Sequence, residues 1–338
     1  MTGPVSDGSL TFLGACIFSA DFRICRLACY SQLPRTPALV WISLSGPGPG
    51  HTLIFGSILK LDDETAVNGT GKDTESYQVS VCEGGACRTR TQKLIGEEPL
   101  LIRIDDKPYS VVMRTPGEEL FHAAGFCLGE GIADTADDFA TIGYCQDLDP
   151  NVIDVRLRPE RRAKIQGILE RRGFVSQTSC GICGKEMIQD LYQILTPIQN
   201  GFSVNINRVL SCIGKLSENQ KYYPSTRGSH AALICDDQLQ VISFAEDVGR
   251  HNALDKAIGK LFMGRKLSEA VILVLSSRIS YELVQKAARA RLPIMISKSR
   301  PTALAVRMGQ ALNMTLACTE KNESSELIIV CGQNRIIF

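Results

Sequence analysis

The chain has 338 residues, of which 44% are hydrophobic and 22% charged, so it is neither largely disordered nor fibrous, and its length predicts one large or two modest globular domains. The 37 lysines and arginines nearly balance the 36 aspartates and glutamates, and a formal net charge of +1 gives no reason to expect nucleic acid or a membrane surface as a partner. The longest apolar runs fall far short of the roughly 20 residues that span a bilayer, so no transmembrane helix is expected.

The N-terminal part of the chain differs from the rest in composition. Residues 45–51 read Ser-Gly-Pro-Gly-Pro-Gly-His, a sequence that holds neither a helix nor a strand. We therefore expect residues 1–74 to form a poorly ordered extension.

The cysteine content bears on the cellular compartment. There are 13 cysteines, an odd number scattered along a long chain. A small secreted domain carries a dense and even set instead. The cysteines therefore predict a reducing compartment.

Residues 75–158 are expected to form a small β-rich module. Residues 115–118 read Thr-Pro-Gly-Glu, which predicts a helix that begins with Thr115 as its N-cap and runs to residue 128. Runs rich in valine or isoleucine and bounded by turn residues predict strands at residues 77–82, 99–104, 110–113 and 151–157.

Residues 159–338 are expected to form a layered α/β domain, because helical and strand patterns alternate along them. Residues 230–235 and 239–245 flank a polar turn and predict a β-hairpin. Helices are predicted at residues 159–172, 187–195, 203–216, 252–262, 281–292 and 302–312, and further strands at 270–275, 293–296 and 314–317.

Cys180 and Cys183 are separated by two residues, a spacing that suits one metal ion, a disulfide or a sulfur-transfer task. A zinc site would need a second such pair, but Cys82 and Cys87 have four residues between them and lie in the other module. A thioredoxin-type pair would be expected near the start of a βαβ unit, whereas this one follows a basic helix. A helix expected to begin near Lys185 favours thiolates, which favours a nucleophilic or sulfur-carrying pair.

Residues 246–256 place many polar side chains around one helix start. Asp247 is expected to cap this helix, and His251 and Asp255 are expected to lie one turn apart on the same face. A structural pair and a binding role both fit this pattern.

A basic cluster follows near the C-terminus. Residues 276–278 and 299–302 each join a strand to a helix, where backbone N–H groups and hydroxyls hold phosphate. A nucleotide phosphate is the favoured ligand, and a solvated basic face is the alternative. No acidic residue interrupts Lys286, Arg289, Arg291, Lys298, Arg300 and Arg307.

A second basic stretch, within residues 156–172, suits a phosphorylated ligand or an acidic protein. His230-Ala231-Ala232 invites comparison with zinc deaminases, but Ala232 stands where their proton-shuttling glutamate is needed. Deamination is therefore not expected.

Several motifs occur together in a specific order: Met113-Arg114-Thr115-Pro116-Gly117, Gly125-Phe126, Glu130-Gly131-Ile132, Ser179-Cys180-Gly181-Ile182-Cys183-Gly184, His230-Ala231-Ala232, Glu246-Asp247-Val248-Gly249-Arg250-His251-Asn252 and Ser277-Arg278-Ile279-Ser280-Tyr281-Glu282-Leu283-Val284-Gln285-Lys286. In this order they resemble the formate dehydrogenase accessory sulfurtransferase family, FdhD, over about residues 77–319. Separate motifs in the right order are more specific than any one cysteine pair.

The resemblance implies a cytidine-deaminase-like layered α/β core, a smaller β-rich N-terminal module and a cytoplasmic homodimer. It implies that sulfur passes from a cysteine desulfurase to the molybdenum (or tungsten) bis(molybdopterin guanine dinucleotide) cofactor, bound as substrate, before that cofactor enters formate dehydrogenase. Cys180 is the implied persulfide carrier and Cys183 its partner. No resident metal is expected. A non-catalytic chaperone for the cofactor is the alternative function, and a zinc-stabilised binding module is a third.

The resemblance also implies a set of residues near the guanine-nucleotide-containing pterin. In the family, the loop after the last common strand carries Gly-Phe, which this chain lacks, and Arg300 replaces a small residue. The implied cofactor-binding residues are Ser277, Arg278, Lys286, Ala317, Cys318, Thr319, Glu320, Lys321 and Asn322.

Overall fold

The computed structural model describes residues 72–144, 150–171, 195–199, 201–320 and 323–338, together with two short strands nearer the N-terminus. These strands, β1 (Ala38–Leu39) and β2 (Ile58–Leu59), pair antiparallel within a first unit, residues 1–66. The second unit comprises residues 67–338. Apart from β1, β2 and its last residues, the extension predicted for residues 1–74 lies outside the described residues, as does most of the helix predicted at 187–195.

A six-stranded sheet forms the centre of the second unit. Its middle strands β12, β13 and β14 are parallel, while β10, β11 and β15 run antiparallel to their neighbours. The predicted hairpin and α/β alternation are therefore confirmed. In sheet order the strands are β11 (Val241–Asp247), β10 (His230–Cys235), β12 (Ile272–Leu275), β13 (Ile294–Ser297), β14 (Thr315–Glu320) and β15 (Glu323–Cys331).

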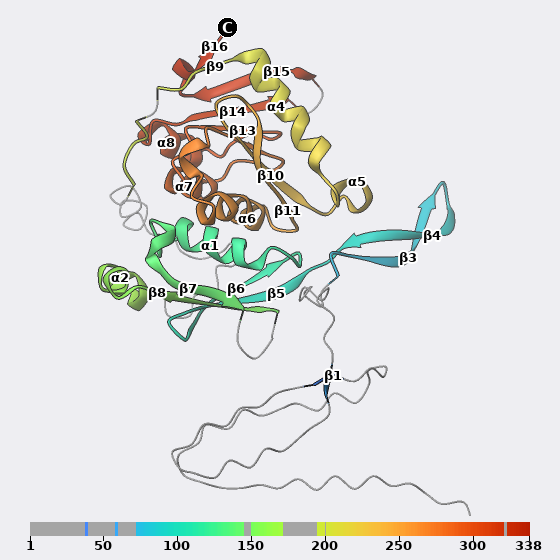
Figure 1. The fold of residues 1–338 in the computed structure, drawn as a ribbon. Helices are drawn as coiled ribbons and strands as arrows, with labels where there is room; N and C mark the ends of the chain where they lie inside the picture. Colours follow the sequence, from blue (N-terminus) through green and yellow to red (C-terminus); the bar gives the residue numbers. More distant parts are fainter. Residues whose placement is uncertain are drawn as a thin grey trace, which may run out of the picture. The chain divides into compact units, whose positions relative to one another are not determined.

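Helices cover both faces of this sheet (Figure 1). Because side chains alternate along a strand, Leu233 packs in the cluster that includes α4, whereas Ile234 packs in the cluster on the opposite face. Helix α4 is Ile206–Asn219, and the opposite face is covered by α6 (Arg250–Met263), α7 (Tyr281–Arg289) and α8 (Ala303–Ala311). Each prediction for these four helices is confirmed to within a few residues.

A second, four-stranded sheet lies beyond the helices, and α1 (Glu119–Gly129) packs between this sheet and α6 (Figure 1). Helices α1 and α6 approach each other closely at two glycines, Gly125 of α1 and Gly259 of α6. A Cβ atom on Gly125 would lie 1.9 Å from the carbonyl oxygen of Asp255, and one on Gly259 would lie 1.8 Å from that of Phe121. The sheet order is β6 (Lys107–Arg114), β5 (Glu98–Ile104), β8 (Val152–Leu157) and β7 (Phe139–Tyr144).

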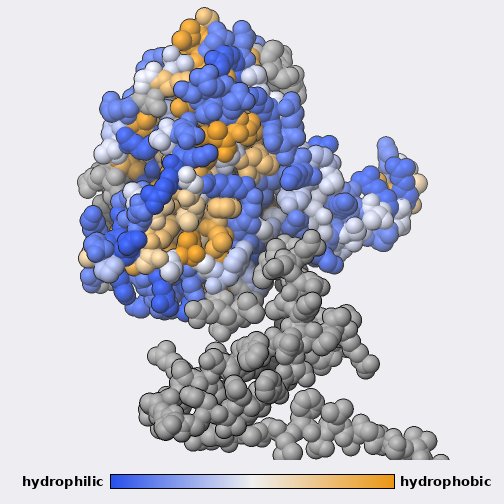
Figure 2. All heavy atoms as spheres, viewed as in Figure 1, coloured by the Kyte–Doolittle hydropathy of each residue, from blue (hydrophilic) through white to orange (hydrophobic). Residues whose placement is uncertain are grey.

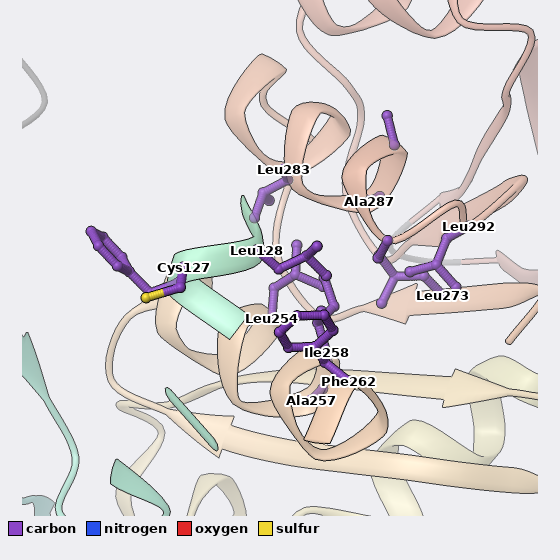
Figure 3. Close-up of a cluster of buried hydrophobic side chains, with 14 of the residues drawn as sticks. Cys127, Leu128, Leu254, Ala257, Ile258, Phe262, Leu273, Leu283, Ala287 and Leu292 are labelled. Atoms are coloured by element: carbon purple, nitrogen blue, oxygen red, sulfur yellow. The ribbon is translucent and has the colours of Figure 1, made fainter. Parts of the chain in front are cut away.

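One hydrophobic cluster joins the two sheets through these helices. Leu128 of α1 lies beside Leu254 and Ile258 of α6 (Figure 3). The same cluster includes Ile153 of β8, so residues on both sides of the domain boundary predicted at residue 158 share one core. That boundary stays a prediction.

The remaining elements lie at the periphery. Hairpin strands β3 (Thr74–Glu83) and β4 (Ala86–Ile95) form an arm, and β9 (Val204–Asn205) pairs with β16 (Ile336–Ile337). The helices at the periphery are α2 (Pro159–Arg171), the short α5 (Tyr223–Thr226) and the 3-10 turns Ala136–Asp138, Leu267–Glu269 and Gln333–Arg335. Among the described residues, no helix combines the length and apolar character that crossing a membrane requires.

The predicted cap of α1 is wrong. The N-cap is Glu118, which has a left-handed backbone with φ 64°, and no side chain caps this helix. The hydroxyl of Thr115 instead accepts a hydrogen bond from the backbone N–H of Val248, 3.0 Å away and 133 residues along the chain. The Thr115 hydroxyl, which the local pattern assigned to the start of the helix, therefore takes part in a long-range hydrogen bond instead.

Candidate functional site

The loops of the six-stranded sheet meet at one edge, which we call the polar edge: His230, residues 247–251, residues 276–282 and residues 297–302. The strand register brings them together. His230 at the start of β10 pairs with Asp247 at the end of β11, and the ends of β12 and β13 align as Leu275 with Ser297. Ser297 in turn aligns with Cys318 near the end of β14. In open α/β sheets such an edge is where ligands bind.

Three helices begin at the polar edge. The N-cap of α6 is Gly249, that of α7 is Ser280 and that of α8 is Thr302, whose hydroxyl accepts a hydrogen bond from the N–H of Ala305 at 3.3 Å. The first N–H groups of a helix have no partner within the helix and carry partial positive charge. The polar edge therefore favours anions.

His230 lies partly buried beside the end of β12. Its Nδ1 is 3.4 Å from the hydroxyl oxygen of Ser276, which accepts a hydrogen bond from the N–H of Ala231 at 2.8 Å. Burial lowers the pKa of His230, and the nearby charge of Arg250 lowers it further. The neutral imidazole of His230 can accept a hydrogen bond at one ring nitrogen and donate one from the other.

His251 and Glu282 form a second polar pair across the starts of α6 and α7. The Nε2 of His251 lies 3.5 Å from the Glu282 carboxylate, to which the Ser280 hydroxyl donates a hydrogen bond at 2.7 Å. His251, chiefly, and Ser280 lower the pKa of Glu282 to about 2, against an opposing contribution from burial. The polar edge therefore holds a carboxylate that stays ionised.

The structure brings together most of the described residues that were predicted to bind the cofactor. Ser277 follows β12 and is buried, with its hydroxyl 3.2 Å from the carbonyl oxygen of Arg278, to which it donates. Arg278 is exposed. Ala317, Cys318 and Thr319 are buried in the last residues of β14, with Glu320 as its final residue.

Lys286 lies elsewhere. It is buried on α7, its Nζ donates to the Asp255 carboxylate at 2.9 Å, and it lies 3.7 Å from Glu130 of the α1 C-cap. It also stacks over the ring of Phe126, 5.4 Å from the centroid. The Lys286 ammonium therefore joins α7 to α6 and α1.

A buried ionic network holds the turn between β11 and α6. The Asp247 carboxylate accepts hydrogen bonds from the Lys256 ammonium at 2.7 Å and from the N–H of Thr115 at 3.1 Å. It also accepts from the N–H of Gly249 at 2.8 Å and from the Asn252 side chain at 2.9 Å. Asp247 was predicted to be the cap of α6, but the N-cap is Gly249, with no side-chain cap.

Comparison with known proteins identifies the family. The model of the FdhD/NarQ family matches residues 95–337, which is more than half of the chain. The chain belongs to the FdhD/NarQ family.

Relatives of this FdhD/NarQ chain cover most of its length. The sulfur carrier protein FdhD of Streptomyces coelicolor is 35% identical over 277 residues, which cover 79% of this chain and 96% of that protein. The sulfur carrier protein FdhD of Mycobacterium tuberculosis is 34% identical over 248 residues, or 70% and 89% of the two chains. A solved structure from Desulfotalea psychrophila, described as a candidate formate dehydrogenase accessory protein, has a TM-score of 0.63 at 21% identity and covers 79% of this chain and 100% of its own. The last comparison shows a shared fold.

Four predicted site residues of this FdhD/NarQ chain lie outside the described residues, namely Cys180, Cys183, Lys321 and Asn322. Their roles stay predictions. Within the described ranges, no three metal-binding side chains of His, Cys, Asp or Glu gather as a metal ion would require.

Three arginines of the basic stretch of residues 156–172 pair with acidic side chains. Arg156 lies 3.0 Å from Asp106, and Arg162 lies 3.3 Å from Asp105. Arg161 pairs with Asp134. These pairs reduce the positive charge that a phosphorylated ligand would meet.

Sequence reasoning placed Ser276 in a phosphate-binding loop and Lys256 in a polar motif, but it gave Thr115 only the role of a helix cap. Lys256 stood in the polar motif but pairs with Asp247 nine residues earlier, and Thr115 comes from the other sheet. Thr115 lies within the family motif at residues 113–117, which was the one available signal.

Proposed function

We propose that this FdhD/NarQ chain accepts sulfur as a persulfide on Cys180 from a cysteine desulfurase and transfers it to the molybdenum bis(molybdopterin guanine dinucleotide) cofactor before that cofactor enters formate dehydrogenase. Cys183 is the second thiol. The relatives described as sulfur carrier proteins, which cover most of this chain, support the proposal. A cytoplasmic homodimer is part of it, as the family resemblance implies.

The observation that carries the proposal is the convergence of three helix N-termini at the polar edge, beside the exposed Arg278. The proposed substrate cofactor carries nucleotide diphosphates. Phosphates bind where backbone N–H groups and an arginine converge, since both supply positive charge and hydrogen-bond donors. Ser277 and the last residues of β14 would lie against the same ligand.

The proposed sulfur chemistry needs only thiols. The Cys180 thiolate attacks the terminal sulfur of the donor persulfide, the S–S bond of the donor breaks, and the donor leaves as a thiolate. The Cys183 thiolate then attacks the inner sulfur of the Cys180 persulfide. A Cys180–Cys183 disulfide forms and the outer sulfur leaves as hydrosulfide for the cofactor, so the two cysteines supply the two electrons. A cellular thiol reductant restores both thiols.

Mass spectrometry of the peptide that contains Cys180 tests the first step. The full chain is incubated with a cysteine desulfurase and cysteine, with and without a reductant. We expect one additional sulfur atom on Cys180 that the reductant removes. Cys183→Ala should retain this sulfur, because discharge needs the second thiol, whereas Cys180→Ala should not acquire it.

Activation of formate dehydrogenase in cells that lack the wild-type protein tests the transfer. Cys180→Ala should abolish activation while the purified variant keeps the far-ultraviolet circular dichroism of the wild type. Activation that survives this substitution would overturn the proposal and favour a chaperone that binds the cofactor without covalent chemistry.

A further inference from the structure

The β3–β4 arm is a regular two-stranded ribbon that extends from the rest of the second unit (Figure 1). Its strands pair in unbroken register from Thr74 opposite Ile95 to Glu83 opposite Ala86. Gly84 and Gly85 form the turn with φ of 58° and 84°, and positive φ at both positions is typical of the tight turn that matches strand twist. Local geometry therefore defines the arm.

The arm contributes no buried side chain, since every residue of β3 and β4 is exposed or half-buried. Its surface is largely hydrophilic, with a few hydrophobic residues toward the tip (Figure 2). Contacts with the body lie at its base, where the Tyr222 hydroxyl donates to Asp73 at 2.8 Å and the Gln92 side chain donates to the carbonyl of Ser225 at 3.0 Å. An isolated two-stranded ribbon is only marginally stable in water.

A disulfide between Cys82 and Cys87 joins the two strands one pair before the turn. Both residues are exposed. The other cysteines that the structure describes are buried: Cys127, Cys212, Cys235, Cys318 and Cys331. Burial raises the pKa of Cys127 and of Cys331, which disfavours their reactive thiolate forms. A hydrogen bond from the Cys235 thiol lowers the pKa of Cys212 to about 7, but burial of Cys212 keeps its sulfur from solvent. Within the described residues, solvent thiols therefore meet cysteine sulfur chiefly at the tip of the arm.

We propose that Cys82 and Cys87 form a thiol–disulfide exchange site for small thiols such as glutathione, and that the oxidation state of this pair controls the order of the β3–β4 arm. A thiolate attacks one sulfur, the Cys82–Cys87 bond breaks, and the second cysteine leaves as a thiolate. A second thiol then resolves the mixed disulfide, so that two thiols become one external disulfide and the arm gains a dithiol. The reverse reaction uses oxidised glutathione.

The order of the arm should follow this chemistry because no hydrophobic core holds the tip. The cross-link restrains the strands next to the turn, and its loss leaves the hydrogen bonds between the strands as the main restraint there. The reducing compartment that the odd cysteine number predicts would keep the pair as a dithiol, and an oxidant would close it. The arm would then become more ordered under oxidising conditions.

Differential alkylation of the native full chain tests the exchange. The protein is equilibrated with reduced or oxidised glutathione, labelled, and analysed by mass spectrometry of the separate cysteine peptides. We expect Cys82 and Cys87 to be labelled after reduction at least about tenfold faster than Cys127 and Cys331, and to be protected after oxidation. A pair that stays closed in reduced glutathione, or open in oxidised glutathione, would overturn the proposal.

Hydrogen–deuterium exchange tests the consequence. Reduction should accelerate exchange of the β3 and β4 amides by about tenfold or more and leave β12 unchanged. The Cys82→Ser, Cys87→Ser double variant should exchange fast under both conditions. The matched control replaces the next pair on the same face, Ser80→Ala with Thr89→Ala, and should keep the redox response. Equal exchange in the oxidised and reduced wild type would contradict control of the arm by the disulfide.

Discussion

Two sets of charged side chains in this FdhD/NarQ chain, one buried and one exposed, differ in what they contact. In the buried layer between α1, α6 and α7, the ammonium groups of Lys256 and Lys286 each face a carboxylate at hydrogen-bond distance. At the polar edge, the Arg278 side chain is exposed. Similar side chains therefore serve two purposes: charges that are buried and paired hold helices together, and charges left at the surface are available to a ligand.

Removal of Lys256 should give the largest effect on the buried layer. Lys256→Met leaves the carboxylate of Asp247 buried without its ammonium partner, so the free energy of unfolding should fall by about 3–5 kcal/mol. Chemical denaturation measures this change. The control Arg156→Met breaks a pair in which both side chains are 60% exposed, and should cost less than about 1 kcal/mol. Equal losses in the two variants would remove the distinction between the two regions.

A methyl group between α1 and α6 should also be costly. In Gly259→Ala the new Cβ would overlap the carbonyl oxygen of Phe121, and the helices would have to separate, at a cost of about 1–3 kcal/mol in the free energy of unfolding. Gly167→Ala on α2 is the control, because nothing lies within 4 Å of its Cβ and alanine favours a helix. Thermal denaturation should show Gly259→Ala less stable than the wild type and Gly167→Ala at least as stable.

Acid should weaken the buried layer through His122. Burial, above all, and the charges of Lys256, Lys286 and Arg114 hold the pKa of this histidine well below its ordinary value. The unfolded chain therefore takes up a proton first as the pH falls below about 6.5, and the free energy of unfolding decreases by up to about 1.4 kcal/mol per pH unit. Urea denaturation between pH 7.5 and about 5.5 measures the slope. His122→Gln should flatten it, and an unchanged slope would assign the acid sensitivity to other groups.

Arg278 should affect binding and leave stability nearly unchanged. Its exposed guanidinium is available to the nucleotide half of the proposed cofactor, for which guanosine diphosphate serves as the probe. Arg278→Ala should raise the dissociation constant by about tenfold, since a charge-assisted hydrogen bond is lost, and change the free energy of unfolding by less than about 0.5 kcal/mol. Isothermal titration calorimetry measures the dissociation constant of Arg278→Ala and of the control variant Arg90→Ala, which lies on the β3–β4 arm. Identical affinities would argue against Arg278 as a phosphate ligand.

Much of the main sheet follows from the sequence alone. Residues 230–235, 272–275 and 294–297 are short apolar runs between turn residues, and burial on both faces requires such runs wherever the flanking helices are placed. The helices between them were predicted for the same reason, because one apolar face recurs every three to four residues. The motif at residues 246–252 overlaps the polar edge.

Tertiary structure determined the strands, and the partners of buried polar side chains, that no local sequence pattern indicates. Strand β4 alternates arginines on one face with threonines on the other over residues 88–91, and all its residues are exposed or half-buried, so its pairing with β3 defines it. Lys286, which the family resemblance placed near the cofactor, is paired with Asp255, and Thr115, predicted to be a helix cap, bonds to Asp247 and Val248. A local sequence pattern specifies which face of an element is apolar, whereas the partner of a buried polar group depends on which distant segment packs against it.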